Sequence, residues 1–340
     1  MKRQGFLYEK ICDTQNIKNA LISASKNKTK KFAVKNALKS FDKSVDLVRD
    51  ILANKTYIPN RYYQATIIDG ITKKERTIYK PKFFPDQIIH WALINVIKPL
   101  LVKSMYHWSC ASIPSRGPHY AKKACEKWIR TDYKNTKYCL KLDIKKYYPN
   151  INKDILKSKF RRIIKDPETL WLVDLIIDSH HEGLPIGNYT SQWFANFYLQ
   201  NTDHYIKEKL GVKYYIRYMD DLVLFGGNKR ELHKTFEKLQ IFLGSEDLEI
   251  KGNWQLFNAT KRGLDFCGFC FSRRKTFVRK RISRRMRTKY FSFQKNANRH
   301  NAAALTSYYG WVVNTDSYVL YIKYYKNIMA KIKEALRLCY

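Results

Sequence analysis

Two adjacent aspartates between two short apolar segments constrain the fold of this chain more than any other feature. Asp220 and Asp221 follow residues 214–218 (Tyr-Tyr-Ile-Arg-Tyr) and precede residues 222–225 (Leu-Val-Leu-Phe). Aromatic and aliphatic runs bounded by turn residues predict a strand–turn–strand hairpin. Asp is depleted in strands, and neighbouring carboxylates repel each other where the dielectric constant is low. The pattern therefore indicates either a plain polar turn, since Asp is common in turns, or a hairpin whose negative charge a bound cation neutralises.

A third aspartate stands near the end of another predicted strand. Residues 138–144 read Tyr-Cys-Leu-Lys-Leu-Asp-Ile, so Asp143 closes an apolar run. If this strand neighbours the hairpin, Asp143 and Asp220 face the same cations. Mg²⁺ is often held by one or two carboxylates plus substrate phosphates, and a pair of such ions can activate an attacking hydroxyl and stabilise a leaving group.

We therefore predict Asp143, Asp220 and Asp221 as catalytic residues. The predicted ligands of two Mg²⁺ ions, with Mn²⁺ as an alternative, are Asp143, Ile144, Asp220 and Asp221.

The charge of the chain indicates a polyanionic partner. Among 340 residues, 65 are Lys or Arg and 29 are Asp or Glu, which gives a formal net charge of +36. The excess is spread along the chain and favours a basic channel or surface over a detachable arm. The 25 Tyr residues add surface on which bases can stack. Composition alone also fits a ribosomal or chromatin protein, so it predicts nucleic-acid binding and no specific chemistry.

The cysteines and the N-terminal segment indicate a reduced compartment. Seven cysteines at irregular spacing argue against a disulfide framework. The close pair Cys267 and Cys270 lacks the second CxxC or the spaced His pair of a zinc site. No apolar signal core follows Met1, and the apolar stretch 88–102 is interrupted and too short to span a bilayer. We therefore expect a cytoplasmic protein with no membrane partner.

Helical patterns dominate both ends of the chain. Residues 1–55 are predicted to be helical, residues 61–80 form a hairpin that turns at Asp69-Gly70, and residues 86–107 form an amphipathic helix. Between residues 273 and 299 the chain has twelve Lys or Arg and no Asp or Glu, while apolar residues keep helical spacing. A last helix is predicted near residues 317–336.

These motifs, in this order, resemble the reverse transcriptases over roughly residues 60–275. Residues 218–221 (Tyr-Met-Asp-Asp) resemble the YxDD box of that family, and residues 141–151 resemble its first palm motif, with Asp143 as the metal ligand. Residues 263–269 are similar to the primer-grip strands, with Cys267 where Leu is common, which assigns this cysteine to packing.

The resemblance implies an α+β fold of the right-hand polymerase type and RNA-directed DNA polymerase activity. It divides the chain into N-terminal helices and fingers over 1–137, a palm of antiparallel sheet and helices over 138–272, and a basic helical thumb over 273–340. No RNase H, endonuclease or maturase extension is expected.

The resemblance also assigns residues to the substrates. Tyr148 stands where an aromatic residue blocks the ribose 2′-hydroxyl, which implies selection of deoxynucleotides. Arg76, assisted by Lys74, belongs to the basic fingers motif that holds the incoming triphosphate. Arg116 lies in a basic loop and is a candidate for template phosphate contact, with a solvated surface charge as the alternative. The candidates for contact with the template–primer backbone in the basic helical segment, which could also be a solvated face, are Arg281, Arg284 and Arg285.

One palm loop departs from most reverse transcriptases, which have Gln before its Gly and Pro after its Ser. Here residues 186–192 read Ile-Gly-Asn-Tyr-Thr-Ser-Gln, so Ile186 and Gln192 occupy those nucleotide-binding positions. This form, and residues 84–93, resemble the enzymes of diversity-generating retroelements. A Gln amide can donate and accept hydrogen bonds beside the nascent base pair, whereas Ile cannot, which weakens polar discrimination. Misincorporation opposite template adenine is implied by the resemblance.

The implied partners are a template RNA, the RNA/cDNA duplex, dNTPs, and a small basic accessory protein that forms an oligomeric barrel. The alternatives are another bacterial reverse transcriptase, of retron, abortive-infection or group II type, and a noncatalytic RNA-binding scaffold. Ile186 and Gln192 argue against the retron and group II types. The three aspartates argue against the scaffold.

Overall fold

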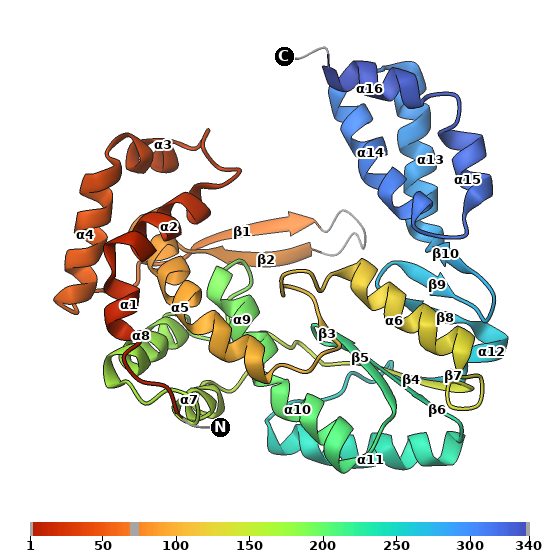
Figure 1. Ribbon diagram of the computed structural model, residues 1–340, viewed down its shortest axis with the longest axis horizontal. Helices are drawn as coiled ribbons and strands as arrows, with labels where there is room; N and C mark the ends of the chain where they lie inside the picture. The colour runs from red at the N-terminus through yellow and green to blue at the C-terminus, as the bar shows by residue number, and fades with distance from the viewer. Residues whose placement is uncertain (1–2, 69–74, 338–340) are drawn as a thin grey trace.

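The structure, a computed structural model, describes residues 3–68 and 75–337 of the chain. Figure 1 shows a group of N-terminal helices, a central sheet with helices around it, and a bundle of helices at the C-terminal end. The N-terminal helices begin at residue 8, and Asp13 caps the second of them by accepting a hydrogen bond from the backbone N–H of Asn16. The helical elements of this region are α1 (Tyr8–Cys12), α2 (Thr14–Ser25), α3 (Phe32–Lys39), α4 (Phe41–Ala53), η1 (Phe83–Gln87) and α5 (Ile88–Ser104).

Helix α5 is buried on more sides than its sequence pattern predicts. Ile89, Leu93 and Ile97 share one face of the helix and lie in the core, but Ile88 and Ile94 are equally inaccessible to solvent. The helix packs against both α2 and α9 (Tyr189–Tyr198). The predicted helix is confirmed, but its burial extends beyond one amphipathic face, because neighbours from distant parts of the sequence cover a second face.

The predicted hairpin over residues 61–80 is confirmed in its strands. Strand β1 (Tyr63–Ile68) pairs antiparallel with β2 (Glu75–Lys80). The register places Tyr63 opposite Lys80 and Ile68 opposite Glu75. The expected turn at Asp69-Gly70 and the predicted nucleotide-binding residue Lys74 lie outside the described residues.

The central sheet has five strands in the order β3-β5-β6-β4-β7. Side chains alternate between its two faces, as expected for strands. Leu140, Leu142 and Leu222 join the largest hydrophobic core, whereas Cys139 and Val223 join a second core on the other face. The strands are β3 (Ser109–Cys110), β4 (Tyr138–Asp143), β5 (Tyr214–Tyr218), β6 (Asp221–Gly226) and β7 (Gln255–Asn258). The remaining helical elements of this region are α6 (Pro118–Thr131), α7 (Lys153–Arg161), α8 (Pro167–Asp178), α10 (Gln200–His204), η2 (Tyr205–Lys209), α11 (Lys229–Ser245) and α12 (Ala259–Arg262).

A three-stranded sheet leads from the central sheet to the C-terminal bundle. Its order is β10-β9-β8, with strands β8 (Leu264–Phe266), β9 (Phe269–Phe271) and β10 (Thr276–Val278). The helices of the bundle are α13 (Lys280–Lys295), α14 (Arg299–Val313), α15 (Tyr318–Tyr324) and α16 (Met329–Arg337). The bundle has its own hydrophobic core, which draws on residues 278–335.

The C-terminal helices differ in two respects from the sequence prediction. The single helix expected near residues 317–336 is divided into α15 and α16. Helix α14, which the apolar spacing did not predict, begins where the side chain of Asn298 accepts a hydrogen bond from the backbone N–H of Asn301. None of the helices in residues 3–68 and 75–337 has the length and apolar character needed to cross a membrane.

Candidate active site

The two predicted strands that carry the aspartates are neighbours in the central sheet. Strand β4 pairs antiparallel with β6, and the register places Asp143 directly opposite Asp221. Opposed residues of an antiparallel pair project from the same face of the sheet. Asp220 lies in the turn between β5 and β6, where its carbonyl accepts a hydrogen bond of 3.2 Å from the backbone N–H of Ile144. The structure therefore brings the three predicted catalytic aspartates to one end of the sheet.

Burial and mutual repulsion make the negative charge of these carboxylates costly. Burial, together with the adjacent Asp143 carboxylate, which is within hydrogen-bonding distance, raises the pKa of Asp220 to about 6. Burial also raises the pKa of Asp221 to about 7, although the ammonium of Lys141 opposes that shift. Such shifts mean that the site is stabilised by a bound proton or by a cation.

Two lysines supply part of the missing positive charge. The Nζ of Lys141 lies 3.6 Å from Oδ2 of Asp221, and the Nζ of Lys251 lies 3.2 Å from Oδ2 of Asp143. The other oxygen of Asp221, Oδ1, is buried and has no hydrogen-bond partner among the described residues. A buried carboxylate oxygen without a donor, beside two carboxyl groups in contact, fits a hard divalent cation.

The side chains do not form a closed metal cage. Within residues 3–68 and 75–337, no group of three or more His, Cys, Asp or Glu side chains could hold a metal ion by itself. Asp143 and Asp220 are in contact, whereas Asp221 pairs with Lys141. Ile144 is buried, so only its backbone could meet a metal. An open set of two carboxylates suits Mg²⁺, which commonly completes its octahedron with water and substrate phosphates.

Tyr148 lies beside the turn that carries the aspartates. Its hydroxyl approaches the Sδ atom of Met219 at 3.9 Å, and its ring is partly buried. Its carbonyl accepts a hydrogen bond of 2.9 Å from the backbone N–H of Leu184. A side chain at Gly183 would collide with the backbone of Tyr148, because a Cβ there would lie 2.4 Å from the carbonyl oxygen. The residue that the resemblance assigns to sugar selection is thus held tightly next to the carboxylates.

The palm loop and the β1–β2 hairpin meet next to the same turn. The backbone N–H of Tyr79 donates a hydrogen bond of 2.7 Å to the carbonyl of Ile186. Gly187 has a φ of +112°, and a Cβ there would lie 3.0 Å from the carbonyl oxygen of Tyr79, so glycine suits both the conformation and the close approach. Arg76, on the same strand as Tyr79, is exposed and close enough to lower the pKa of Asp220.

The other predicted binding residues lie in three places. Gln192 is exposed on α9, in contrast to the partly buried Ile186. The guanidinium of Arg116 donates a hydrogen bond of 3.1 Å to the carbonyl of Tyr106 and is partly buried, so part of its bonding capacity serves the protein backbone. The three arginines of the basic segment lie on α13, where Arg281 and Arg284 are exposed and Arg285 is partly exposed.

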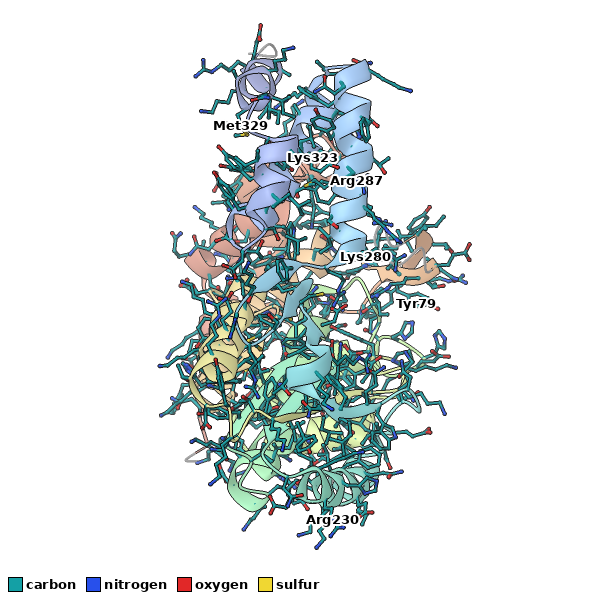
Figure 2. All side chains as sticks on the ribbon, turned by 90° about the vertical axis from the view of Figure 1, so that its right-hand side faces the viewer. Tyr79, Arg230, Lys280, Arg287, Lys323 and Met329 are labelled. Atoms are coloured by element: carbon teal, nitrogen blue, oxygen red, sulfur yellow. The ribbon has the colours of Figure 1, made fainter. Side chains whose placement is uncertain are left out.

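Helix α13 and the β1–β2 hairpin rise on the same side of the central sheet. In Figure 1 the strands of the hairpin run towards the C-terminal bundle. Figure 2 shows Lys280 at the base of α13 and Arg287 further along it, above the hairpin residue Tyr79. The basic helix and the hairpin that carries Arg76 therefore lie on the same side of the sheet.

A cavity of about 610 Å³ lies between strand β7, helix α12 and the β8–β9 hairpin. It begins at Lys141, the lysine that pairs with Asp221, and it extends to Arg279 at the start of α13. Its other charged lining residues are Lys261, Arg262 and Asp265. Four cations against one carboxylate make this cavity a suitable place for an anionic backbone.

Sequence reasoning missed the residue that lies directly beneath the catalytic turn. Arg217 was assigned to an apolar strand, yet its guanidinium is fully buried and lies 2.7 Å from the carboxylate of Asp203. The available signal was a single arginine in an otherwise apolar run, three residues before Asp220. Its partner Asp203 lies in α10 and carries no signal of its own. Lys251, the counter-ion of Asp143, was also missed.

Comparisons with known proteins bear on the fold and the family. The family described as reverse transcriptase (RNA-dependent DNA polymerase) matches residues 71–270. The retron Ec73 reverse transcriptase of Escherichia coli is 29% identical over 170 residues, which are 45% of this chain and 51% of that protein. The chain thus spans about half the length of this curated relative.

The structure is also similar to telomerase from Candida albicans, solved in complex with the TWJ fragment of telomeric RNA. The TM-score is 0.53 at 11% sequence identity, and the match covers 86% of this chain and 64% of the telomerase chain. At this identity the similarity shows the fold alone, and it confirms the α+β right-hand polymerase fold. Because the family match also covers more than half of the chain, the protein belongs to the reverse transcriptase family.

Proposed function

We propose that this protein is an RNA-directed DNA polymerase that extends a primer by in-line nucleotidyl transfer. The observation that carries the proposal is the meeting of Asp143, Asp220 and Asp221 at one end of the central sheet, with raised pKa values for the last two. Carboxylates whose negative charge is costly without a counter-ion are suited to bind cations that arrive with a triphosphate. The family match supports the reaction class.

Asp143 and Asp220 would hold the metal, because their carboxyl groups are in contact with each other. Asp221 would either release its ion pair with Lys141 and bind the metal, or stay in the outer coordination sphere of the metal. When bound, Mg²⁺ would lower the pKa of the primer 3′-hydroxyl and neutralise charge on the leaving pyrophosphate. Arg76 approaches the same carboxylates from the fingers and would bind the triphosphate oxygens. Lys74 is proposed to assist it.

Tyr148 is proposed to exclude ribonucleotides. Its position between Gly183 and the Met219 side chain leaves it little freedom to withdraw from a 2′-hydroxyl. Ile186 is proposed to line the nascent base pair, since its carbonyl is fixed to Tyr79 and its side chain is partly exposed. Gln192 lies on α9, the helix that follows this loop.

The template–primer duplex is proposed to run from the carboxylates over the basic cavity to α13. Four cations line that cavity. Phosphate contacts of this kind fix the position of a duplex without reading its sequence. Arg281, Arg284 and Arg285 are proposed to extend this contact, and Arg116 to touch the template strand. In this scheme residues 1–137 act as fingers, 138–272 as palm and 273–340 as thumb, and the separate core over 278–335 supports the last of these.

We further propose the mutagenic enzyme of a diversity-generating retroelement as the specific role. The support is the sequence of the palm loop, in which Ile186 and Gln192 replace the usual Gln and Pro. Nothing polar on the Ile186 side chain can restrain the geometry of the nascent pair. The proposed partners are a cognate template RNA and a small basic accessory protein that forms an oligomeric barrel.

A retron-type reverse transcriptase is the second candidate. The similarity to the retron Ec73 enzyme favours it, at 29% identity over 170 residues. The two candidates differ in the accuracy of the cDNA. A diversity-generating enzyme should make errors concentrated opposite template adenine, whereas a retron-type enzyme should not.

The test is primer extension on a defined RNA template with Mg²⁺, followed by sequencing of the cDNA. Wild-type protein should extend the primer, and Asp221→Asn should not. The matched control is Asp50→Asn, which removes one exposed carboxylate far along the chain in α4. If neither added template RNA nor a candidate accessory protein yields product from the wild type, the polymerase proposal is wrong.

The subfamily is tested in the same assay with Ile186→Gln. This change returns an amide to the nascent pair and should reduce errors opposite adenine more than errors opposite other bases. Accurate cDNA from the wild type would leave the polymerase in place and would favour the retron-type candidate.

A further inference from the structure

A fully buried arginine supports the turn that carries Asp220. Arg217 lies on β5, two residues before the turn, and none of its surface is exposed to solvent. Its guanidinium points at acceptors from four separate parts of the chain. The acceptors within 3.1 Å are Oδ1 and Oδ2 of Asp203, Oδ1 of Asn196, Oγ of Ser109 and the carbonyl of Met219.

Every N–H of this guanidinium has an acceptor. Nε and one terminal nitrogen bind the two oxygens of Asp203 at 2.8 and 2.7 Å, which is the bidentate geometry of the strongest Arg–carboxylate pairs. The remaining three N–H groups reach Ser109 at 2.8 Å, Asn196 at 3.1 Å and the carbonyl of Met219 at 3.0 Å. Such complete use of five donors fixes the plane and the position of the side chain.

Stability alone gives a poor reason for such a group. Replacing a buried ion pair by apolar residues of similar volume is often neutral or stabilising, because both ions lose their hydration on folding. Here the pair lies directly under the catalytic turn. A fixed hydrogen-bond donor at that place can hold a backbone carbonyl of the turn in position, which an apolar pair could not do.

The turn itself needs external support. Met219 has a φ of +55°, a left-handed conformation that is strained for a residue with a side chain. Its N–H donates to the carbonyl of Cys110 at 3.4 Å, and its carbonyl accepts from Arg217. The next carbonyl, of Asp220, accepts from the N–H of Ile144. Cys110, Arg217 and Ile144 thus hold three successive peptide units, and the last two of these flank the Cα atom of Asp220.

We propose that Arg217 is a positioning residue, which sets the place of the Asp220 carboxylate by holding the Met219 carbonyl in this strained turn. Asp203 neutralises Arg217 and fixes its orientation, while Asn196 and Ser109 complete the set. The inference rests on the proposed function, in that Asp220 is taken as a metal ligand. It predicts that the network affects the metal site and the chemical step, and leaves the binding of substrates unchanged.

The experiment compares the full-length wild type with Arg217→Lys. A lysine keeps the charge but offers an ammonium in place of the planar fork, so it cannot bind Asp203 and Met219 together with the same geometry. For single-nucleotide addition to an RNA-templated primer, kcat should fall by about 100-fold, which is the loss that a displacement of about 1 Å can cause. The KM for dNTP and the Kd for the template–primer should stay as in the wild type.

A second readout follows the metal without catalysis. Mn²⁺ binding is measured by electron paramagnetic resonance, on the protein with a chain-terminated primer and a dNTP. Arg217→Lys should bind Mn²⁺ about tenfold more weakly, as expected when a ligand of a near-octahedral site is misplaced. The Mg²⁺ concentration for half-maximal extension should rise in parallel.

Two further variants separate positioning from general loss of structure. Lys159→Met breaks another buried ion pair, that of Lys159 and Glu246, which does not contact the turn. It should lower the melting temperature but keep the wild-type kcat per folded molecule and the wild-type Mn²⁺ affinity. Ser109→Ala removes one acceptor of Arg217 and leaves the pair with Asp203, so it should fold even if Arg217→Lys does not. It should reduce kcat and Mn²⁺ affinity in the same direction by a smaller factor.

The results for these variants decide whether Arg217 is a positioning residue. A fall in kcat and in Mn²⁺ affinity for Arg217→Lys or Ser109→Ala, but not for Lys159→Met, supports positioning. Variants that are only less stable, with unchanged kcat and Mn²⁺ affinity per folded molecule, would overturn it. If the wild type itself is as inactive as Asp221→Asn, the proposed function fails. That outcome differs from the result that supports positioning and from the result that overturns it.

Discussion

Gly183 offers a direct way to move Tyr148 without touching its side chain. A Cβ at residue 183 would lie 2.4 Å from the carbonyl oxygen of Tyr148 and 2.6 Å from that of Pro149, and both are backbone atoms that cannot rotate away. The same carbonyl of Tyr148 accepts the hydrogen bond from Leu184. Gly183→Ala must therefore displace the backbone that carries Tyr148.

The size of the effect follows from these distances. Real Cβ atoms essentially never approach closer than 3.0 Å, so the backbone at Tyr148 has to move by at least about 0.6 Å. Overpacking of this kind costs about 1–3 kcal/mol of unfolding free energy. Because a displacement of about 1 Å in an active site can cost about 100-fold in rate, we expect kcat to fall about tenfold.

Displacement of Tyr148 should also change the choice of sugar. The assay is single-nucleotide addition with dNTP and rNTP, combined with urea unfolding of the same protein. Gly183→Ala should lower the ratio of kcat/KM for dNTP to that for rNTP. The control is Gly244→Ala in α11, where an added Cβ meets nothing within 4 Å. That change should stabilise the fold by about 0.5–1 kcal/mol and leave sugar selection unaltered.

The reasoning would be refuted if Gly183→Ala unfolded at the wild-type urea concentration and kept wild-type sugar selection. The contact would then be relieved at no cost, and the close packing behind Tyr148 would have no role in its position. If Gly183→Ala lost stability but kept wild-type sugar selection, the close packing at Gly183 would contribute to the stability of the fold and not to sugar selection.

Three further predictions concern the selection of deoxynucleotides by Tyr148, the packing of the hydrophobic core and the pH dependence of stability. Tyr148→Ala should increase rNTP incorporation relative to dNTP in the same assay, and unchanged discrimination would remove Tyr148 from sugar selection. Phe160→Ala deletes a fully buried ring that packs against two other phenylalanines, and it should cost about 3–5 kcal/mol in urea unfolding; a cost below about 1 kcal/mol would contradict that packing. Hydrogen bonds from Asn135 and Lys213 hold the pKa of Asp132 well below its usual range, so its contribution to stability is present above about pH 4 and is lost as the pH falls through the lowered pKa. Asp132→Asn should flatten the acid side of the stability curve, and an unchanged curve would exclude this contribution.

Several elements were predictable because their signals are local. The hairpin strands β1 and β2, the strand that ends at Asp143, and the β5–β6 hairpin follow from short apolar runs between turn residues. The structure adds another local signal at the start of α11, where the side chain of Asn228 accepts a hydrogen bond from the backbone N–H of Arg230. The division of the last predicted helix and the presence of α14 were not predictable in this way, because their apolar residues face a core that several helices share.

The sequence by itself determined that the protein has paired aspartates at strand ends, a strongly basic surface and the motif order of the reverse transcriptase family. Residue types and their spacing carry this information, since strands, turns and net charge depend on neighbours in the chain. The register that sets Asp143 opposite Asp221 was decided only by the tertiary structure. The tertiary structure also decided the counter-ions: Lys141 lies 80 residues from its partner Asp221, and Lys251 lies 108 residues from its partner Asp143.

Arg217 shows the same division most clearly. In the sequence it is one basic residue in an apolar strand, with nothing to name its partners. In the structure Ser109, Asn196 and Asp203, from three other elements, converge on its guanidinium. Hydrogen bonds reach only about 3 Å and require defined angles, so their formation depends on how distant segments pack. The sequence therefore specified the chemistry of this site, and the packing of the chain specified its geometry.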